Sequence, residues 1–374
     1  MSVNDAVDGS STGIAMCHNG VLGTAKEEPS MDKVSTIGID IAKNVFQVHG
    51  IDVEGSVVVR RQLRRGQVMA FFRKLSPCLV GMEACATAHH WARQLIELGH
   101  EVKLMPPHYV KPYVKRSKND ATDAAAICEA VTRPSMRFVS VKSLDQQAVL
   151  VLHRSRELLV RQRTMLINAI RAHMAEFGLI APAGVPRVKE LLAVIADEED
   201  SRLPSVARTC LKGLVRQFLS LEKEITAIER RIRRWHRSNE VSQRLETIPG
   251  IGPIIASALT ATITNPEVFK SGRELAAWIG LVPRQNSTGG KQRLGKISKQ
   301  GDQYLRWLLI AGAMSVVHHA KRRGQSNLPW LADIIDRKPT KVAAVALANK
   351  NARIVWALLR YGETYRSPQS VSVE

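Results

Sequence analysis

The sequence has few of the features that mark secreted or membrane proteins. It has five cysteines in 374 residues, without a Cys-x-x-Cys pair, which excludes a disulfide framework or zinc site and favours a reducing cytoplasm. The longest apolar stretch, from Leu308 to Val317, is half of the roughly 18–20 residues that a membrane-spanning helix needs. No basic segment followed by an apolar core opens the chain, so no signal peptide is expected.

Acidic residues are scarce relative to basic ones. There are 34 Asp and Glu against 54 Lys and Arg, so the formal net charge is +20. This excess predicts a polyanionic partner, and the lack of a long apolar run favours nucleic acid over a membrane. Residues 1–36 have a net charge of −3 and are rich in Gly, Ser and Asn. Residues 1–33 are therefore expected to form a disordered leader outside the working domains.

The rest of the chain is predicted to form three parts and a tail. Residues 34–140 form an α/β domain, 141–244 a connector of long helices, 245–366 a mainly α domain, and 367–374 the tail. In the first domain, short β-branched runs predict strands and longer amphipathic runs predict helices. The expected strands are 34–41, 45–51, 56–63, 78–82 and 101–105, and the expected helices are 67–75, 84–98 and 121–131.

Two long amphipathic helices are expected in the connector. Leu152, Leu159 and Leu166 are seven residues apart within a helix predicted over 143–177. A second apolar face runs from Leu211 to Ile232 at three- and four-residue spacing. This pattern predicts either an antiparallel coiled coil, which could also mediate dimerisation, or simple packing of two helices within one chain.

Four carboxylates of the α/β domain are candidate metal ligands. Asp40 lies in the first strand, Glu83 follows the fourth, and Asp120 and Asp123 are three residues apart at a helix start. An N-cap role would explain Asp120 or Asp123 alone, but Asp40 is costly to bury without a partner. Together the four predict a site for two Mg²⁺ or Mn²⁺ ions that supports phosphoryl transfer. Acids at these positions predict a ribonuclease H-like or RuvC-like fold.

A glycine-rich turn begins the C-terminal domain. In Ile248-Pro-Gly-Ile-Gly-Pro, Gly250 and Gly252 resemble a helix-hairpin-helix turn, whose backbone N–H groups approach a phosphate. A Gly-Pro turn between packed helices would give the same pattern. The preceding segment 201–244 has eleven Lys and Arg against four Glu. This excess of positive charge is larger than a solvated helix face usually has.

A basic loop is predicted from Pro283 to Gly301. In it, Ser287 and Thr288 precede two glycines and stand among several cations. A hydroxyl there could attack a phosphodiester, but chemistry alone favours a phosphate-binding loop without a nucleophile. The spacing of a P-loop is absent. The predicted nucleic-acid contacts of this domain are Gly250, Gly252, Arg284, Thr288, Lys291, Arg293, Lys296 and Lys299.

Six motifs in this order resemble transposases of the insertion sequence 110 family, most closely its 1111 subgroup, over residues 34–366. They are Gly38-Ile-Asp-Ile-Ala-Lys, Met82-Glu-Ala-Cys-Ala-Thr, Lys118-Asn-Asp-Ala-Thr-Asp, Ile248-Pro-Gly-Ile-Gly-Pro, Gly280-Leu-Val-Pro-Arg-Gln-Asn-Ser-Thr-Gly-Gly-Lys and Val342-Ala-Ala-Val-Ala-Leu-Ala-Asn-Lys. The resemblance implies a RuvC-like domain, a coiled-coil connection and a C-terminal transposase domain. It also implies that Asp40, Glu83, Asp120 and Asp123 are the DEDD metal site.

The resemblance further implies a serine that becomes covalently joined to DNA. Ser287 is the candidate, which reverses the preference from chemistry alone, and Thr288 beside it leaves the choice between the two open. The family also implies a structured non-coding guide RNA that pairs with donor and target DNA. The enzyme is expected to assemble as a homo-oligomer, a dimer or tetramer with composite active sites, in the bacterial cytoplasm at the nucleoid.

The predicted function is therefore RNA-guided DNA transposition or recombination through a phosphoserine intermediate, assisted by Mg²⁺ or Mn²⁺. One alternative is a metal-only nuclease like a Holliday-junction resolvase, with water as nucleophile. Another is a non-enzymatic helix-hairpin-helix protein that binds nucleic acid. An actin-like ATPase shares the Gly-Ile-Asp start, but the sequence has no second phosphate loop or adenosine motif, and the charge argues against it.

Overall fold

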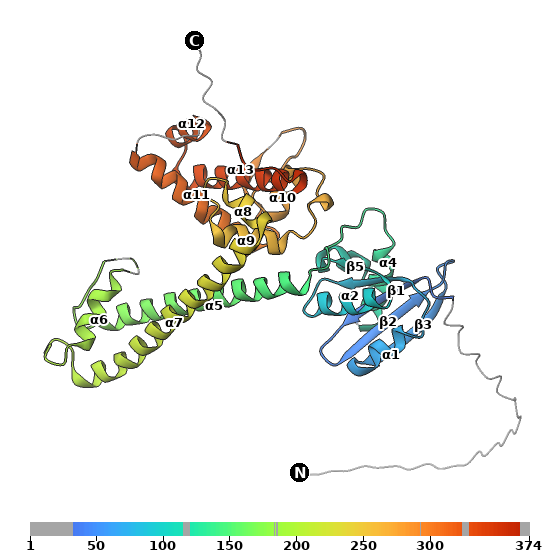
Figure 1. Cartoon of the computed structure of the whole chain (residues 1–374), viewed down its shortest axis with the longest axis horizontal. Helices are drawn as coiled ribbons and strands as arrows, with labels where there is room; N and C mark the ends of the chain where they lie inside the picture. Colours follow the sequence, from blue (N-terminus) through green and yellow to red (C-terminus); the bar gives the residue numbers. More distant parts are fainter. Residues whose placement is uncertain are drawn as a thin grey trace, which may run out of the picture. The chain divides into compact units, whose positions relative to one another are not determined.

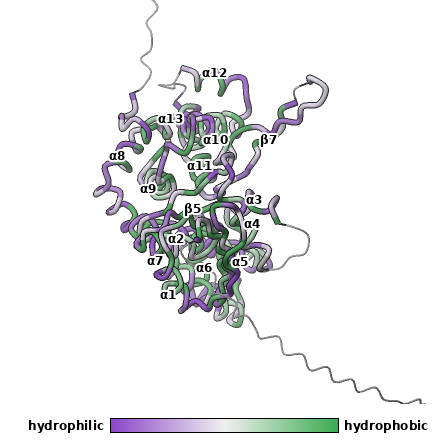
Figure 2. The backbone as a smooth tube through the Cα atoms, turned by 90° about the vertical axis from the view of Figure 1, so that its right-hand side faces the viewer, coloured by the Kyte–Doolittle hydropathy of each residue, from purple (hydrophilic) through white to green (hydrophobic). Residues whose placement is uncertain are grey.

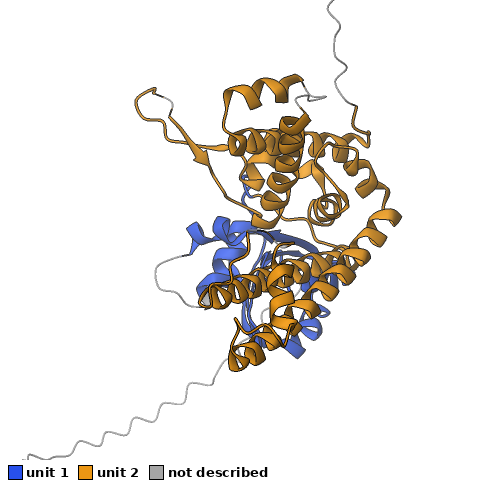
Figure 3. Ribbon diagram, turned by 90° about the vertical axis from the view of Figure 1, so that its left-hand side faces the viewer, with its two compact units in different colours: residues 1–136 blue, residues 137–374 orange. Residues whose placement is uncertain are grey.

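The computed structural model describes residues 33–114, 120–182, 184, 186–291, 293–323 and 329–366, with only the backbone of Asp120 and Ala121. The chain divides into two compact units, residues 1–136 and 137–374 (Figure 3). The leader and tail predicted at the two ends fall outside the described residues, apart from Lys33. The long helices expected to form a separate connector belong to the second unit.

Unit 1 is built on a five-stranded sheet in the order β3-β2-β1-β4-β5 (Figure 1). The strands are β1 Thr36–Ile41, β2 Val45–Ile51, β3 Val57–Arg64, β4 Leu79–Glu83 and β5 Glu101–Met105. The first three form an antiparallel meander, and β4 and β5 run parallel to β1. The mixed α/β architecture predicted for this domain is confirmed, and each strand agrees with its predicted range to within two residues.

Helix α4 packs directly on this sheet because two strands carry glycine where the helix approaches. The helices of unit 1 are α1 Val68–Phe72, α2 Ala88–Glu97, α3 Pro107–Val110 and α4 Asp120–Val131. A Cβ added at Gly38 would lie 2.2 Å from the Ala124 carbonyl oxygen, and one at Gly81 would lie 2.8 Å from Val131. No larger side chain fits under α4 at these points. Ile127 and Val131 are buried in the same contact.

Helix α2 begins four residues later than predicted. The sequence predicted a start at Ala84, but the backbone turns at Thr87, which has a φ of +71°. Residues other than glycine rarely adopt this left-handed conformation, so it interrupts a continuous helix. The chain between Glu83 and Ala88 therefore forms a short loop after β4.

Unit 2 is mainly helical. Its elements are α5 Leu144–Ala175, α6 Val188–Ala196, α7 Ser205–Ser238, α8 Glu240–Glu246, α9 Pro253–Thr262, α10 Gly272–Ile279, β6 Pro283–Gln285, β7 Leu294–Ile297, α11 Gln303–Arg323, α12 Pro329–Arg337 and α13 Thr340–Tyr361. Figure 2 shows hydrophobic and hydrophilic residues mixed along these helices, as expected for helices with one buried face. The predicted helical C-terminal region is confirmed.

Helices α5 and α7 pack against each other in opposite directions. Arg156 of α5 pairs with Glu229 at 2.8 Å, and Arg163, seven residues later, pairs with Glu222, seven residues earlier in α7, at 2.9 Å. Ser143 caps α5 by accepting a hydrogen bond from the Gln146 backbone N–H. The pairing of the two helices within one chain is one of the two arrangements expected for them.

The C-terminal core is centred on α13. Leu347, Ala352 and Val355 are buried there among residues from α9, α10 and α11. By length and composition α13 is apolar enough to span a membrane, although charged residues interrupt its apolar sequence. This is weak evidence, because a core helix of a soluble protein passes the same test and 44% of the apolar window is buried.

Between α10 and α11 the chain forms a two-stranded hairpin where the sequence predicted a loop. Strands β6 and β7 are antiparallel, and the hairpin projects from the helices of unit 2 (Figure 3). The strand residues are almost all exposed and show no alternation of apolar and polar residues. The usual sequence signal of a strand is therefore missing.

Candidate functional site

Asp40 and Glu83 lie side by side on the face of the sheet that α4 covers. Ile39 of β1 pairs with Met82 of β4 in parallel register, so the next residues of the two strands are neighbours. Side chains alternate along a strand, so Asp40 lies on the same face as Gly38, against which α4 packs. By the same alternation, Glu83 shares the face of Gly81.

Asp123 joins them from α4, one residue before the helix contact with Gly38. Asp40, Glu83 and Asp123 are all half-buried and are called the acid cluster below. Burial is the main cause that raises the pKa of Glu83, and the negative charges of Asp40 and Asp123 raise it further. Asp120 is the first residue of α4, but its side chain is outside what the structure describes.

The acid cluster has the chemistry of a divalent-cation site without a formed ligand set. Within the described residues, no three His, Cys, Asp or Glu side chains are arranged to hold a metal ion. The hard oxygen ligands nevertheless suit Mg²⁺ or Mn²⁺. Burial raises the pKa of Glu83 most, and a cation would relieve the carboxylate repulsion that raises it further. These residues therefore fit the predicted metal, with Asp120 as the remaining predicted ligand.

The tip of the hairpin in unit 2 is a tight two-residue turn. Thr288 and Lys291 face each other across it, and the Lys291 backbone N–H donates to the Thr288 carbonyl at 3.1 Å. Gly289 and Gly290 have φ values of +57° and +77°, the left-handed conformations that this hairpin turn requires at both central positions. The paired glycines are thus explained by the turn itself.

Ser287 precedes this turn and is exposed to solvent. The Gln285 side-chain amide donates a hydrogen bond to the Ser287 Oγ at 3.1 Å. The predicted contact residues Lys291 and Arg293 are also exposed, and Thr288 belongs to the turn. The hairpin therefore brings the candidate hydroxyl and several cations together on one projecting element.

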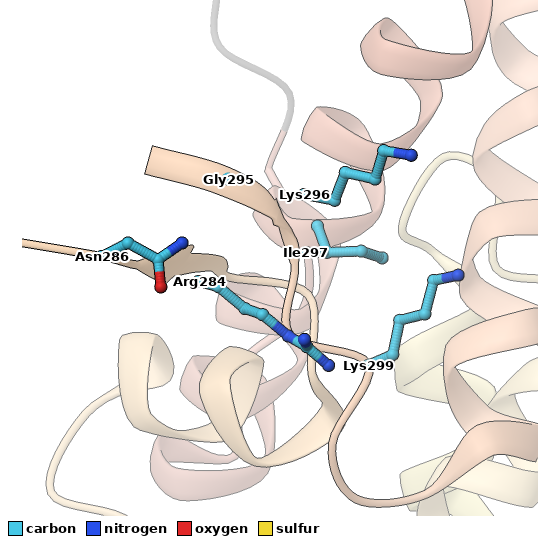
Figure 4. A pocket seen from close by; sticks show the side chains of 6 residues that line it. All are labelled: Arg284, Asn286, Gly295, Lys296, Ile297 and Lys299. Atoms are coloured by element: carbon cyan, nitrogen blue, oxygen red, sulfur yellow. The ribbon is translucent and has the colours of Figure 1, made fainter. Parts of the chain in front are cut away.

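A cationic hollow of about 350 Å³ lies nearer the base of the hairpin. Figure 4 shows the side chains around it, which are Arg284, Asn286, Gly295, Lys296, Ile297 and Lys299. Three are cations and none is acidic, which suits a phosphate group. The sequence predicts the cations but not Asn286, because an amide in a basic loop has no distinctive spacing.

Lys299 is held at this hollow in an unusual backbone conformation. Its φ is +56°, and its N–H donates to the Gly280 carbonyl at 3.1 Å. The buried Arg306 guanidinium donates to the carbonyls of Ile279 and Gln300 at 2.8 and 2.7 Å, which joins the two ends of the hairpin. The left-handed conformation costs about 1–2 kcal/mol, and the surrounding contacts maintain it. Nothing in the sequence predicted this arrangement.

The glycine turn between α8 and α9 has two different glycines. Gly250, with a φ of +88°, packs against the backbone of Gly312 in α11, where an added Cβ would lie 3.0 Å from the carbonyl oxygen. The Asn351 side chain donates to the Pro249 carbonyl at 2.9 Å and fixes the turn. Gly252 has open space at the start of α9. Gly250 therefore has a packing role, whereas a side chain at Gly252 would meet open space.

Comparison with known proteins agrees with these features. The model of the Transposase IS116/IS110/IS902 family matches residues 242–327, which include the glycine turn and the hairpin. The model of a DEDD transposase domain of IS110 type matches residues 37–178, which include all four predicted acids.

Several relatives are similar along nearly their whole length. A probable family 20 transposase of Pseudomonas aeruginosa is 53% identical over 89% of this chain and 99% of its own length. The transposases of IS1111A from Coxiella burnetii and IS1328 from Yersinia enterocolitica are each 41% identical. These cover 95% and 90% of this chain, and 97% and 99% of their own lengths. The chain belongs to the IS110/IS116/IS902 family of insertion-sequence transposases.

Proposed function

We propose that this transposase cuts and rejoins DNA through a phosphoserine intermediate, with Mg²⁺ or Mn²⁺ held by a RuvC-like unit 1. The observation that carries the proposal is the acid cluster. Two half-buried carboxylates on one face of the sheet lie with Asp123 of α4, and burial together with the charges of Asp40 and Asp123 raises the pKa of Glu83. Such an arrangement is unfavourable in isolation and is stabilised by a bound cation.

In the proposed reaction, the Ser287 hydroxyl is the nucleophile. Its oxygen forms a bond to phosphorus, the bond from phosphorus to one deoxyribose oxygen breaks, and the seryl proton passes to solvent while the leaving oxygen takes one up. A second strand end then attacks the phosphoserine and releases the serine, so the energy of the phosphodiester is conserved. Asp40, Glu83, Asp120 and Asp123 would hold the metal, which supplies positive charge to the reacting phosphate.

The hairpin supports this proposal through its charge. The cations of the hollow, Arg284, Lys296 and Lys299, would bind the phosphodiester near the serine and offset the charge that develops on it. Thr288, Lys291 and Arg293 would contact the backbone around the turn. At the glycine turn, Gly250 and Gly252 are the proposed phosphate contacts through their backbone N–H groups, and Gly250 also packs against α11.

The test is to trap the covalent adduct with an oligonucleotide of the element's end and map it by mass spectrometry. The adduct should form on Ser287, persist in Thr288→Ala and disappear in Ser287→Ala. An adduct mapped to Thr288 would overturn the assignment of the nucleophile. Complete absence of an adduct during active cleavage would favour a metal-only nuclease with water as the nucleophile.

We also propose that the enzyme binds the element's non-coding RNA as a guide. The support is the size of the cation excess, +20 over the chain, which suits two polyanions better than one. Purification of the full chain from cells that carry the whole element should recover one RNA species from its non-coding region. Recovery of only heterogeneous cellular RNA would contradict guidance. Such an enzyme would act at the nucleoid in the cytoplasm.

The proposed homo-oligomer is supported by an exposed apolar stripe on α5. Leu144, Val151, Leu158 and Met165 are seven residues apart and between 56% and 72% exposed. A heptad stripe of this kind is complementary to a second copy of itself. Sedimentation velocity should show that Leu158→Glu shifts the protein towards monomer, whereas Val268→Glu, at another exposed apolar position, does not. An unchanged oligomer in Leu158→Glu would exclude this face.

A further inference from the structure

Helix α7 carries a straight line of cations on its solvent side. Arg216, Lys223, Arg230 and Arg237 are seven residues apart, and all four are exposed. Seven residues make almost two helical turns, so the four side chains leave the helix on the same side. They are called the α7 stripe below. The helix is one of the two long ones in Figure 1.

The α7 stripe lies opposite the side that packs against α5. Phe218, Ile225 and Ile232 are buried, and each follows a residue of the stripe by two positions. Two residues correspond to about 200° around a helix, so each cation lies nearly opposite a buried side chain. The stripe therefore has no role in the core of unit 2.

Most charges of α7 are sorted between these two sides, and Glu224 is its one exposed glutamate. The helix has nine Lys and Arg and three Glu. Glu222 and Glu229 pair with arginines of α5. Among the described residues, the four cations of the stripe make no ion pair with a carboxylate. A solvated helix face normally mixes the two signs, so this separation needs another explanation.

We propose that the α7 stripe binds the phosphate backbone of double-stranded DNA, outside the acid cluster and the hairpin. From Arg216 to Arg237 the stripe spans about 32 Å, at about 1.5 Å per residue. One turn of duplex DNA is about 34–36 Å long. Both ends of the stripe can therefore meet one strand a full turn apart, while its middle meets the other strand.

A duplex fits this surface better than single-stranded nucleic acid does. Single strands are held by stacking their bases on aromatic side chains. The only aromatic side chains of α7 large enough for this are Phe218, which is buried, and Trp235. The Trp235 indole donates a hydrogen bond to Asp145 of α5 at 3.0 Å, so it is turned away from the stripe. The stripe therefore offers only positively charged contacts, which suit the regular phosphate backbone of a duplex.

The test measures binding of the full chain to a labelled 30-base-pair DNA of random sequence over a series of salt concentrations. All proteins carry Ser287→Ala, so covalent chemistry cannot affect the result. The test variant combines Arg216→Gln, Lys223→Gln, Arg230→Gln and Arg237→Gln. The control combines Arg161→Gln, Arg187→Gln, Arg202→Gln and Arg360→Gln, which removes the same charge from exposed, ion-paired positions.

The stripe variant should reduce the slope of log K against log salt by about 3–4, since each phosphate contact contributes about 0.9. The control should keep the wild-type slope. An unchanged slope in the stripe variant, or an equal loss in the control, would overturn the proposal. A loss seen only with an RNA duplex of the same sequence would overturn the assignment to DNA. Arg230→Gln alone should still lower the slope by about 0.9 if the quadruple variant unfolds.

Discussion

The acid cluster and the hairpin hold their functional side chains in different ways. The acids of unit 1 stand on two neighbouring strands and on a helix that glycines allow to approach within contact distance. Ser287 stands on an exposed two-stranded hairpin, and a Cβ added at either glycine of its tip would meet nothing within 4 Å. Packing fixes the first site before any ligand binds, and local turn geometry alone fixes the second.

This difference follows from what each site would bind. Carboxylates that share a small cation must keep their spacing, because their repulsion would otherwise separate them. A nucleophile that must reach a phosphodiester in a large nucleic-acid complex gains from projecting into solvent. The hairpin base nevertheless stays ordered, because Arg306 ties its two ends together. Substitutions at the two sites should therefore have distinct effects on stability and activity.

The largest effect is expected from Asp40→Asn. It should lower the rate of recombination by about a hundredfold to a thousandfold, the scale of losing one preorganised charge at a reacting group. The Mn²⁺ concentration for half-maximal activity should rise as well. A recombination assay at several Mn²⁺ concentrations measures both. The control is Glu97→Gln, which removes an exposed charge from α2 of the same unit. Wild-type activity of Asp40→Asn would refute a metal role for the acid cluster.

A pH effect is expected from a buried histidine of unit 2. His153 lies between the Tyr304 hydroxyl, at 3.0 Å, and the Ser257 hydroxyl, at 3.1 Å. Burial lowers the pKa of His153 from 6.5 to about 4. Between these values the unfolded chain binds the proton and the folded chain does not. The free energy of unfolding should therefore fall by up to about 3 kcal/mol as the pH drops from 6.5 to 4.

Urea unfolding at pH 7 and pH 4.5 measures this loss. His153→Gln should be less stable than the wild type at pH 7 but should lose less stability on acidification, because glutamine does not titrate. If the variant and the wild type lose the same stability, other groups cause the acid sensitivity.

The third effect concerns how α4 is held over the acids. Gly38→Ala forces a methyl group towards the Ala124 carbonyl, so it should destabilise unit 1 by about 1–3 kcal/mol. It should also weaken Mn²⁺ binding, because Asp123 moves with the helix. Gly66→Ala is the matched control, since a Cβ at Gly66 meets nothing within 4 Å. Thermal unfolding and Mn²⁺ titration of both variants test this, and equal stability would mean that α4 adjusts freely.

The two sites also differ in how far the sequence predicts them. Strands β1 and β4 were predicted closely, because buried β-branched runs bounded by turn residues have few other folds. Asp40 and Glu83 follow from strand position. Asp123 can be assigned to the acid cluster only from the tertiary structure. Without the contact of α4 with Gly38, an N-cap role would explain this residue equally well. Burial and repulsion at Glu83 are visible only once these elements are packed.

The hairpin was harder to predict for the opposite reason. Its strands are short and polar, so no alternation marks them, and the paired glycines were assigned to a loop where the structure has a tight turn. The left-handed conformation of Lys299 depends on contacts with Gly280 and on Arg306, which is distant from the turn. Local sequence contains none of this information.

The smallest effect is expected at the tip of the hairpin. Gly290→Ala introduces a side chain at a φ of +77°, with nothing within 4 Å of the new Cβ, so the only cost is about 1 kcal/mol of backbone strain. Because the hairpin tip is outside the core, hydrogen exchange of its amides should accelerate severalfold while the unfolding midpoint stays unchanged. The adduct with DNA should form about fivefold more slowly, the equivalent of 1 kcal/mol. Gly66→Ala, at a glycine of unit 1 without a positive φ and with nothing within 4 Å of the added Cβ, should leave both readouts unchanged. A lower unfolding midpoint in Gly290→Ala would mean that the turn supports the fold of unit 2, and the contrast between a packed acid site and a locally held serine would then be wrong.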